Sequence, residues 1–242
     1  MLYYRLMTSH MSDIFQRGMS WHTYLNLERD FIDITRYVAL DRNHAGVWSE
    51  KISQLLLLTG STVDSSFKEM GVSSFLDKFK PVIELQQKPE PNIGDYREAY
   101  DPIYQLSGVE LRVRYGLADY GKINPFQPFA PKNNPAWWNA YNDVKHGFFQ
   151  SMDKGTLDNL VHALGALFAL NILHMDSKKY LSNTGLIRVG YLDRMMIVPM
   201  DRSGIWNYLK NSYIGSRCGA AFDCWVNSAV FLHVFREDTK PP

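Results

Sequence analysis

The stretch Pro135-Ala-Trp-Trp-Asn-Ala-Tyr-Asn-Asp-Val-Lys-His146 decides how the rest of the chain is interpreted. It predicts a short helix, because Asn134 is a residue type that caps helix starts and Pro135 is favoured at the first helical position. Gly147 predicts the end of this helix. At least one of the two neighbouring tryptophans is expected to pack in a core, as large aromatic side chains usually do.

Three polar residues of this stretch form the most promising site in the sequence. Asn142, Lys145 and His146 are three and four positions apart, so a helix places them on one face. An amide, an ammonium group and an imidazole then point in the same direction. The sequence therefore predicts that the end of this helix carries a compact polar cluster.

The composition is that of a globular protein with a sizeable core. The chain has 242 residues, of which 45% are hydrophobic and 21% charged, and its formal net charge is +1. A charge so close to zero produces no overall basic field. A nucleic-acid partner would therefore have to bind a local patch.

Several features bound the cellular context and the cofactors. Two cysteines, Cys218 and Cys224, are too few for a disulfide framework, which favours a reducing cytoplasmic location. His233 has no second Cys/His pair at ligand spacing, so we expect neither a metal nor another cofactor. Met1 to Phe15 lacks a signal-type apolar run, and the apolar stretch from Leu160 to Leu173 is too short to span a bilayer.

Two helices are expected in the first third of the chain. The first begins at Ser20, and Glu28 falls largely off its apolar stripe. That stripe consists of Tyr24, Leu27, Phe31, Ile34 and Val38. The second begins at about Val47, and Gly60 is a candidate bend within it. Asp64 follows a hydrophobic run, so we expect it either to pair with Lys68 one turn away or to pair with a cation from another helix.

The remainder of the chain mixes helices with a few strands. Amphipathic patterns predict helical pieces within 72–92 and 94–106, and a long helix from Thr156 to about Met175. Residues 109–115 alternate between apolar and charged residues, which predicts a strand with Arg112 and Arg114 on its solvent face. Residues 186–191 and 195–200 predict a β-hairpin.

Several of these motifs, taken in order, resemble HEPN-type helical domains of bacteria and phages. Residues 141–146, the two tryptophans before them and residues 156–167 resemble the C-terminal half of such domains. Residues 27–37 and 53–68 resemble their first two core helices. The resemblance covers roughly residues 20–175 and leaves the last part of the chain unassigned.

The resemblance implies a mainly α fold, an HEPN-like up-and-down bundle of four to five helices that often pairs as a homodimer. We expect the bundle to span residues 1–182 and a C-terminal extension over 183–242 to pack on it. The expected fold also includes a small β element. Many members of the wider group are metal-independent ribonucleases of toxin–antitoxin or anti-phage systems. Their signature places an arginine at 139–141, where this chain has Asn139, Ala140 and Tyr141.

Three interpretations of the polar cluster are open. In the first, Lys145 pairs with Asp64 in a buried network that fixes the helices. In the second, the chain cleaves RNA without metal, with His146 as base or acid, Lys145 facing the phosphate and Asn142 donating a hydrogen bond. In the third, the bundle binds RNA or a protein partner, such as an antitoxin, without chemistry.

Four further residues are candidates for RNA contact. Trp137 and Trp138 could stack on bases, and Arg112 and Arg114 could contact phosphates from the face of the predicted strand. For each of them the alternative is structural: core packing of the tryptophans and a solvated strand face for the arginines. No membrane partner is expected.

Overall fold

The computed structural model describes residues 18–71, 76, 79–115, 120–174, 177, 180–181, 183–184, 186–191, 222–227 and 230–235. Within these residues the chain is mainly α-helical, as predicted. The helices are α2 (Met19–Ile34), α3 (Glu50–Met70), α4 (Lys80–Gln86), α5 (Ile93–Tyr104), α6 (Ala136–His146) and α7 (Leu157–Leu173). They match the predicted ranges to within a few residues, and the helical piece expected within 72–92 is α4.

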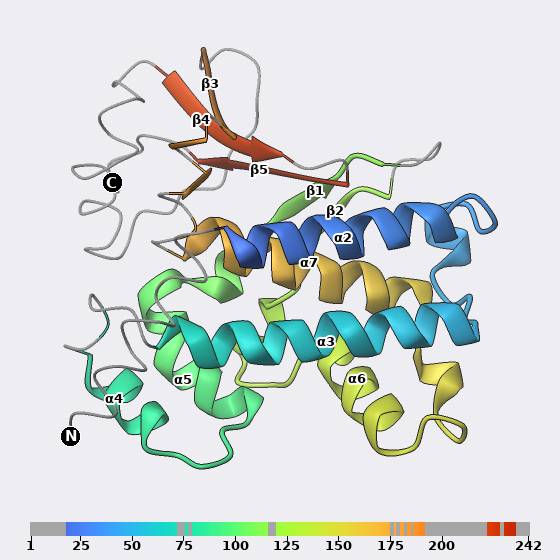
Figure 1. The fold of residues 1–242 in the computed structure, drawn as a ribbon, viewed down its shortest axis with the longest axis horizontal. Coiled ribbons are helices and arrows are strands. Elements are labelled where there is room, and N and C mark those ends of the chain that lie inside the picture. The colour runs from blue at the N-terminus through green and yellow to red at the C-terminus, as the bar shows by residue number, and fades with distance from the viewer. Residues whose placement is uncertain are drawn as a thin grey trace.

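The helix α7 lies at the centre of the helical layer. It packs against α2, α3 and α6, and its most extensive contact is with α3 (Figure 1). From Leu160 onward nearly all of its side chains are buried, whichever way they point. A helix that is apolar all round is a core helix, so α7 organises the helices around it.

Five short strands form one antiparallel sheet on the side of α2 and α7 that faces away from α5 and α6 (Figure 1). They are β1 (Leu111–Val113), β2 (Lys122–Ile123), β3 (Ile187–Tyr191), β4 (Phe222–Asn227) and β5 (Phe231–Phe235), in the spatial order β2-β1-β5-β4-β3. Arg112 of β1 lies opposite Leu232 of β5, so strands from both parts of the chain share the sheet. The domain boundary expected at residue 183 stays a prediction.

The sheet confirms one strand prediction and changes the pairing of another. The strand expected over 109–115 is β1, shorter than predicted. The first strand of the expected hairpin is β3, but it pairs with β4 along its whole length, from Ile187 opposite Val226 to Tyr191 opposite Phe222. Residues 195–200, which were expected to form the second strand of that hairpin, lie outside the described residues.

The ends of the helices follow from local chemistry, with one correction. The Thr156 hydroxyl accepts a hydrogen bond from the Asn159 backbone N–H and begins α7 as predicted. Gly147 ends α6, also as predicted. However, α6 begins one residue later than expected: Pro135 occupies the cap position, and Asn134 does not cap the helix. The Pro135 carbonyl starts α6 by accepting hydrogen bonds from residues 138 and 139.

Two glycines allow close approaches that position the layers. Gly60 does not bend α3, which is continuous from Glu50 to Met70. Instead, a Cβ at residue 60 would overlap the ring of Tyr141 on α6. On α7, a Cβ at Gly165 would lie 2.7 Å from the Cδ1 atom of Ile123 in the sheet. The missing side chains therefore bring α6 against α3 and the sheet against α7.

Glu28 differs from its expected position off the apolar stripe, because its side chain is only 4% exposed. Its Oε1 accepts a hydrogen bond of 2.7 Å from the Tyr24 hydroxyl and one of 3.1 Å from the Val230 backbone N–H. Val230 stands directly before β5, so this carboxyl group ties α2 to the sheet. Sequence periodicity could not show this, since both the sheet and its partner residue are distant in the chain.

The Gly60 approach predicts that Gly60→Ala destabilises the protein. Alanine stabilises a helix by about 1 kcal/mol relative to glycine. The clash of its methyl group with the Tyr141 ring should exceed this gain by about 1–3 kcal/mol. Urea unfolding measures the difference. Gly46→Ala is the control, because a Cβ there meets nothing within 4 Å. In a Tyr141→Ala background the cost of Gly60→Ala should vanish, and a cost that persists there would contradict the proposed clash.

The Glu28 bridge predicts that Glu28→Ala costs about 2–3 kcal/mol of unfolding free energy, as expected for hydrogen bonds to a buried charged group. Asp33→Ala on the same helix is the matched control. Its carboxylate is about half exposed and pairs with neighbouring Arg36, so about 0–1 kcal/mol is expected. Equal effects of the two substitutions in chemical denaturation would show that Glu28 does not hold the sheet to α2.

Candidate functional site

The predicted polar face of α6 exists, but it lies at the surface and not in a buried network. Lys145 and His146 are exposed, and Asn142 is half-buried. The Asn142 amide donates a hydrogen bond of 3.0 Å to the Trp138 carbonyl on its own helix. The Lys145 ammonium lies 5.5 Å from the centroid of the Tyr141 ring, at the range of a cation–π contact. The side chains of Lys145 and His146 are therefore accessible to a partner.

The expected pairing of Lys145 with Asp64 is wrong. Both carboxylate oxygens of Asp64 have closer partners: Oδ2 lies 2.6 Å from the Lys68 ammonium, and Oδ1 accepts a hydrogen bond of 2.9 Å from the Tyr96 hydroxyl. The local alternative, a pair one helical turn apart, is confirmed. Burial raises the pKa of Tyr96, and the Asp64 carboxylate raises it further, so the hydroxyl stays a neutral donor.

The tryptophans are core residues and not base-stacking platforms. Trp137 is 1% exposed and Trp138 is 6% exposed. The Trp137 indole N–H donates a hydrogen bond of 2.8 Å to the Pro125 carbonyl, and its ring meets Phe126 edge to face. With both rings buried, neither face can reach an RNA base. The prediction of RNA contacts through these residues is therefore wrong.

Arg112 of β1 and Arg114, the residue that follows the strand, are both exposed, as the alternating pattern predicts. Val113 between them is buried. Arg112 lies opposite Lys122 of β2, whose ammonium pairs with Glu110 at 2.5 Å. Whether the two arginines contact phosphates stays a prediction. The charge of Lys122, which lies opposite Arg112, is compensated by Glu110.

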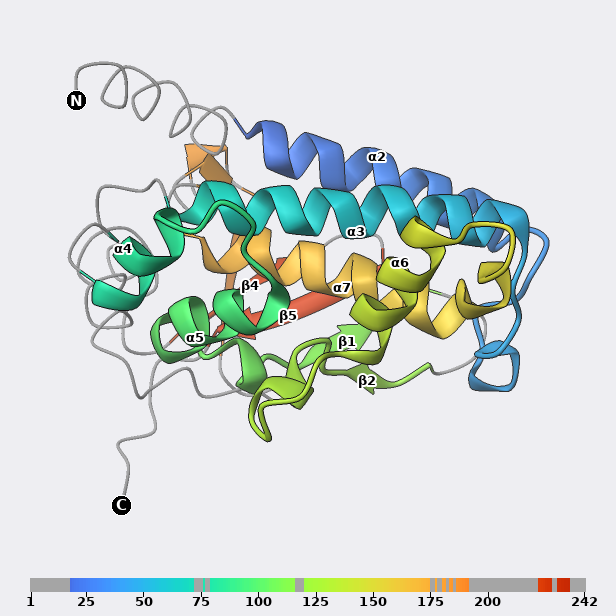
Figure 2. The same ribbon diagram turned by 90° about the horizontal axis from the view of Figure 1, so that it is seen from below.

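The exposed aromatic side chains gather at one end of the helical layer. In the part of the chain that the structure describes, three large aromatic side chains are exposed: Tyr37 by 89%, Trp48 by 51% and Phe149 by 85%. They follow α2, precede α3 and follow α6, and Figures 1 and 2 show these three segment ends at the same end of the molecule. We call this surface, with Tyr37, Trp48 and Phe149, the aromatic end.

Backbone hydrogen bonds hold the segments of the aromatic end together. The N–H of Leu157 donates to the Val47 carbonyl at 2.8 Å, and the N–H of Asp158 donates to the Ala45 carbonyl at 3.0 Å. The Ser53 hydroxyl donates to the Met152 carbonyl at 2.9 Å. The loop that carries Trp48 is therefore fixed against the start of α7, and the segment that follows Phe149 is fixed against α3.

A second polar cluster, which sequence reasoning missed, joins the connection between α2 and α3 to Tyr120 and to the first turn of α7. Arg42 donates from Nε to the Tyr120 carbonyl at 2.8 Å and from Nη2 to the Lys122 carbonyl at 3.1 Å. Its guanidinium carbon lies 4.3 Å from the centroid of the Tyr120 ring. The Tyr120 hydroxyl donates to Asp158 at 2.6 Å, and the Asp158 carboxylate lies 3.6 Å from Arg42.

The side chains of this cluster bind one another, which indicates a structural role. His162 lies one turn after Asp158, and its Nδ1 is 2.9 Å from the Asp158 carbonyl. The charges of Arg42 and Asp158 compensate each other. Burial raises the pKa of Tyr120, and the hydrogen bond to Asp158 raises it further. Only the spacing of Asp158 and His162 was visible in the sequence. The nearest of their partners, Tyr120, lies 38 positions from Asp158.

Among the described residues, no three His, Cys, Asp or Glu side chains lie together as a metal site would require. None of the helices in this part of the chain is both long enough and apolar enough to cross a bilayer. Cys218 lies outside the described residues, and Cys224 and His233 lie on β4 and β5.

His174 is a buried histidine at the end of α7 that the predicted site does not use. It is 1% exposed. Burial lowers the pKa of His174 to about 3, and a hydrogen bond to the backbone of Met70 opposes this shift only in part. The imidazole is therefore neutral in the folded protein at neutral pH, where it links the ends of α7 and α3.

His174 predicts a loss of stability in acid. Below pH 6.5 the unfolded chain binds a proton at this imidazole that the folded protein does not bind until about pH 3. The unfolding free energy should therefore fall by up to about 1.4 kcal/mol per pH unit in this window. Chemical denaturation from pH 7 to 4 should show a shallower dependence for His174→Gln than for the exposed-histidine control His44→Gln. Equal slopes would exclude a neutral, buried His174.

We compared the chain with models of protein families, with curated proteins and with solved structures. None of the three comparisons gives a match. The resemblance to HEPN domains therefore rests on the sequence motifs alone, and inferences about function rest on the residues of this chain.

Proposed function

We propose that this protein is an HEPN-like helical module that binds single-stranded RNA at the aromatic end. The observation that carries the proposal is that Tyr37, Trp48 and Phe149 are exposed on segments at that end. Lys145 and His146 are exposed at the end of α6, four and three residues before Phe149. Exposed aromatic rings together with exposed basic side chains are the chemistry that binds unpaired bases and their phosphates.

The side chains of the aromatic end favour unpaired bases over a duplex. Phe149 lies three residues after His146, and the Phe148 and Phe149 rings meet edge to face with their centroids 5.6 Å apart. A projecting ring can stack on a base only if that base is unpaired. Duplex RNA offers mainly phosphates and 2′-hydroxyls, for which a protein of net charge +1 has little attraction.

Lys145 and His146 supply the contacts to phosphate. Both are exposed at the end of α6. Because these phosphate contacts are few, RNA binding should depend on stacking more than on charge. Salt should therefore weaken RNA binding only moderately. The motifs that resemble HEPN domains suggest that such a module acts in a bacterial defence or toxin–antitoxin system.

A metal-independent ribonuclease is the second candidate, because His146 is exposed and adjacent to Lys145. Two observations disfavour it. The arginine of the HEPN signature is absent at 139–141, and the Asn142 amide is engaged by its own helix at 3.0 Å. Binding without cleavage therefore accounts for the geometry with fewer requirements.

The proposal predicts that Phe149→Ala weakens binding of fluorescently labelled single-stranded RNA by about tenfold, as loss of one stacked base requires. Fluorescence anisotropy measures the affinity. Leu58→Ala, which removes an exposed apolar side chain (57%) from the middle of α3, is the matched control and should change nothing. Equal affinity of Phe149→Ala and the wild type, or equal affinity for duplex RNA, would contradict the proposal.

Salt and metal chelation separate the alternatives in the same experiment. The logarithm of the affinity should fall with the logarithm of the salt concentration with a slope of about −1, as for one or two phosphates, and less steeply for Lys145→Ala. In EDTA the bound RNA should stay intact. Cleavage by the wild type but not by His146→Ala, leaving 2′,3′-cyclic phosphate ends, would instead establish the ribonuclease.

A further inference from the structure

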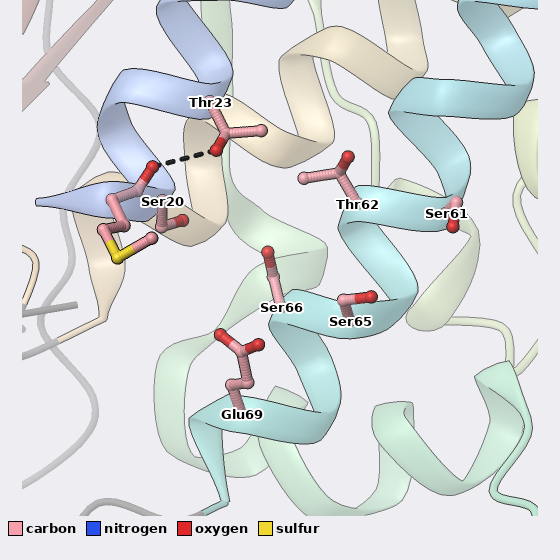
Figure 3. Close-up of a pocket in the computed structure, with 8 residues that line it drawn as sticks. Ser20, Thr23, Ser61, Thr62, Ser65, Ser66 and Glu69 are labelled. Carbon is pink, nitrogen blue, oxygen red and sulfur yellow. Dashed lines mark hydrogen bonds between the residues drawn. The ribbon is translucent and has the colours of Figure 1, made fainter. Parts of the chain in front are cut away.

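A second candidate site lies at the end of the molecule opposite the aromatic end. A pocket of about 300 Å³ opens between the first turns of α2 and the second half of α3 (Figure 3). Seven of its lining residues carry a hydroxyl or carboxyl group: Ser20, Thr23, Ser61, Thr62, Ser65, Ser66 and Glu69. Met19 completes the wall with an apolar side chain. Such a lining favours a small polar ligand over a hydrophobic one.

The hydroxyl groups of the pocket differ in whether they already form hydrogen bonds within the protein. Thr23 donates to the Met19 carbonyl at 2.9 Å, and Thr62 donates to the Leu58 carbonyl at 2.7 Å, so their oxygens remain acceptors. Ser20 is 8% exposed, and its hydroxyl has no hydrogen-bond partner in the described structure. Figure 3 shows this hydroxyl on the side of α2 that faces Thr62 and Ser66. A buried polar group without a partner costs free energy, and a ligand in the pocket would supply the missing bond.

Glu69 provides the charge of the pocket. Its carboxyl group is half-buried, and burial raises its pKa. None of the ion pairs formed by the described residues involves Glu69, although Lys68 beside it pairs with Asp64. A partly desolvated carboxylate without a cation gains most from a ligand that brings a positive charge and hydrogen-bond donors.

We propose that this pocket binds a small protonated amine that carries hydroxyl groups, such as an amino sugar. The ammonium group pairs with Glu69, while the ligand hydroxyls exchange hydrogen bonds with Ser20, Ser66 and the free lone pairs of Thr62. The apolar face of the sugar ring lies on Met19. The site is separate from the aromatic end, because α2 runs from Met19 to Ile34 between them.

Isothermal titration calorimetry with glucosamine, N-acetylglucosamine and glucose tests the proposal, at a pH where the glucosamine amine is protonated. Glucosamine should bind at least about tenfold more tightly than the two neutral sugars, because a hydrogen bond between charged groups is stronger than a neutral one. Glu69→Gln should remove this preference. Glu84→Gln, an exposed carboxylate paired with Lys80, is the matched control and should leave it intact.

Ser20→Ala distinguishes a binding site from a structural pocket. Removing an unpaired buried hydroxyl should leave the melting temperature of the ligand-free protein unchanged or raise it, while weakening glucosamine binding by about fivefold or more. Circular dichroism verifies that each variant is folded. Equal binding of the three sugars, no binding of any, or an unchanged preference in Glu69→Gln would overturn the proposal, and none of these outcomes bears on RNA binding at the aromatic end.

Discussion

The complete burial of α7 is the constraint on which the rest of the structure depends. A helix with apolar residues on every side must be surrounded, and here α2, α3 and α6 surround it together with the sheet. Small residues at Ala163, Gly165 and Ala166 let these neighbours approach closely, so the packing around α7 fixes where the ends of the other helices lie. The aromatic end is a consequence: it forms where three helices end or begin beside the first turn of α7.

Sequence patterns identified the helices because each helix carries its own periodicity. The stripe from Tyr24 to Ile34 and the caps at Thr156 and Gly147 are local signals, and each corresponds to an observed feature. The pair between Asp64 and Lys68 is also local. Sheet pairing is different, because strands of two to six residues carry little information about their partners. The pairing of β3 with β4, across 30 intervening residues, could not be deduced from the composition of either strand.

The candidate site shows the same division between local and distant information. Periodicity placed Asn142, Lys145 and His146 on one face correctly, but it could not show whether that face is buried. Burial depends on what packs against α6, and the partner of α6 is set by Gly60 and Tyr141, which lie on different helices. Glu28 is buried in the helical layer, and its partner Val230 is 202 residues away. Long-range partners of this kind decide which polar residues are structural and which remain available for binding.

The pairing of β1 with β5 has a consequence for the order in which the protein folds during synthesis. Residues 111–113 leave the ribosome long before residues 231–235, and until then the edge of β1 that receives β5 has no strand beside it. The helices can pack around α7 as soon as residue 173 has emerged, because their contacts lie within the part already made. Completion of the sheet is therefore a late step that joins the last strand to the middle of the chain, and chains released before that step expose an unpaired strand edge that favours aggregation.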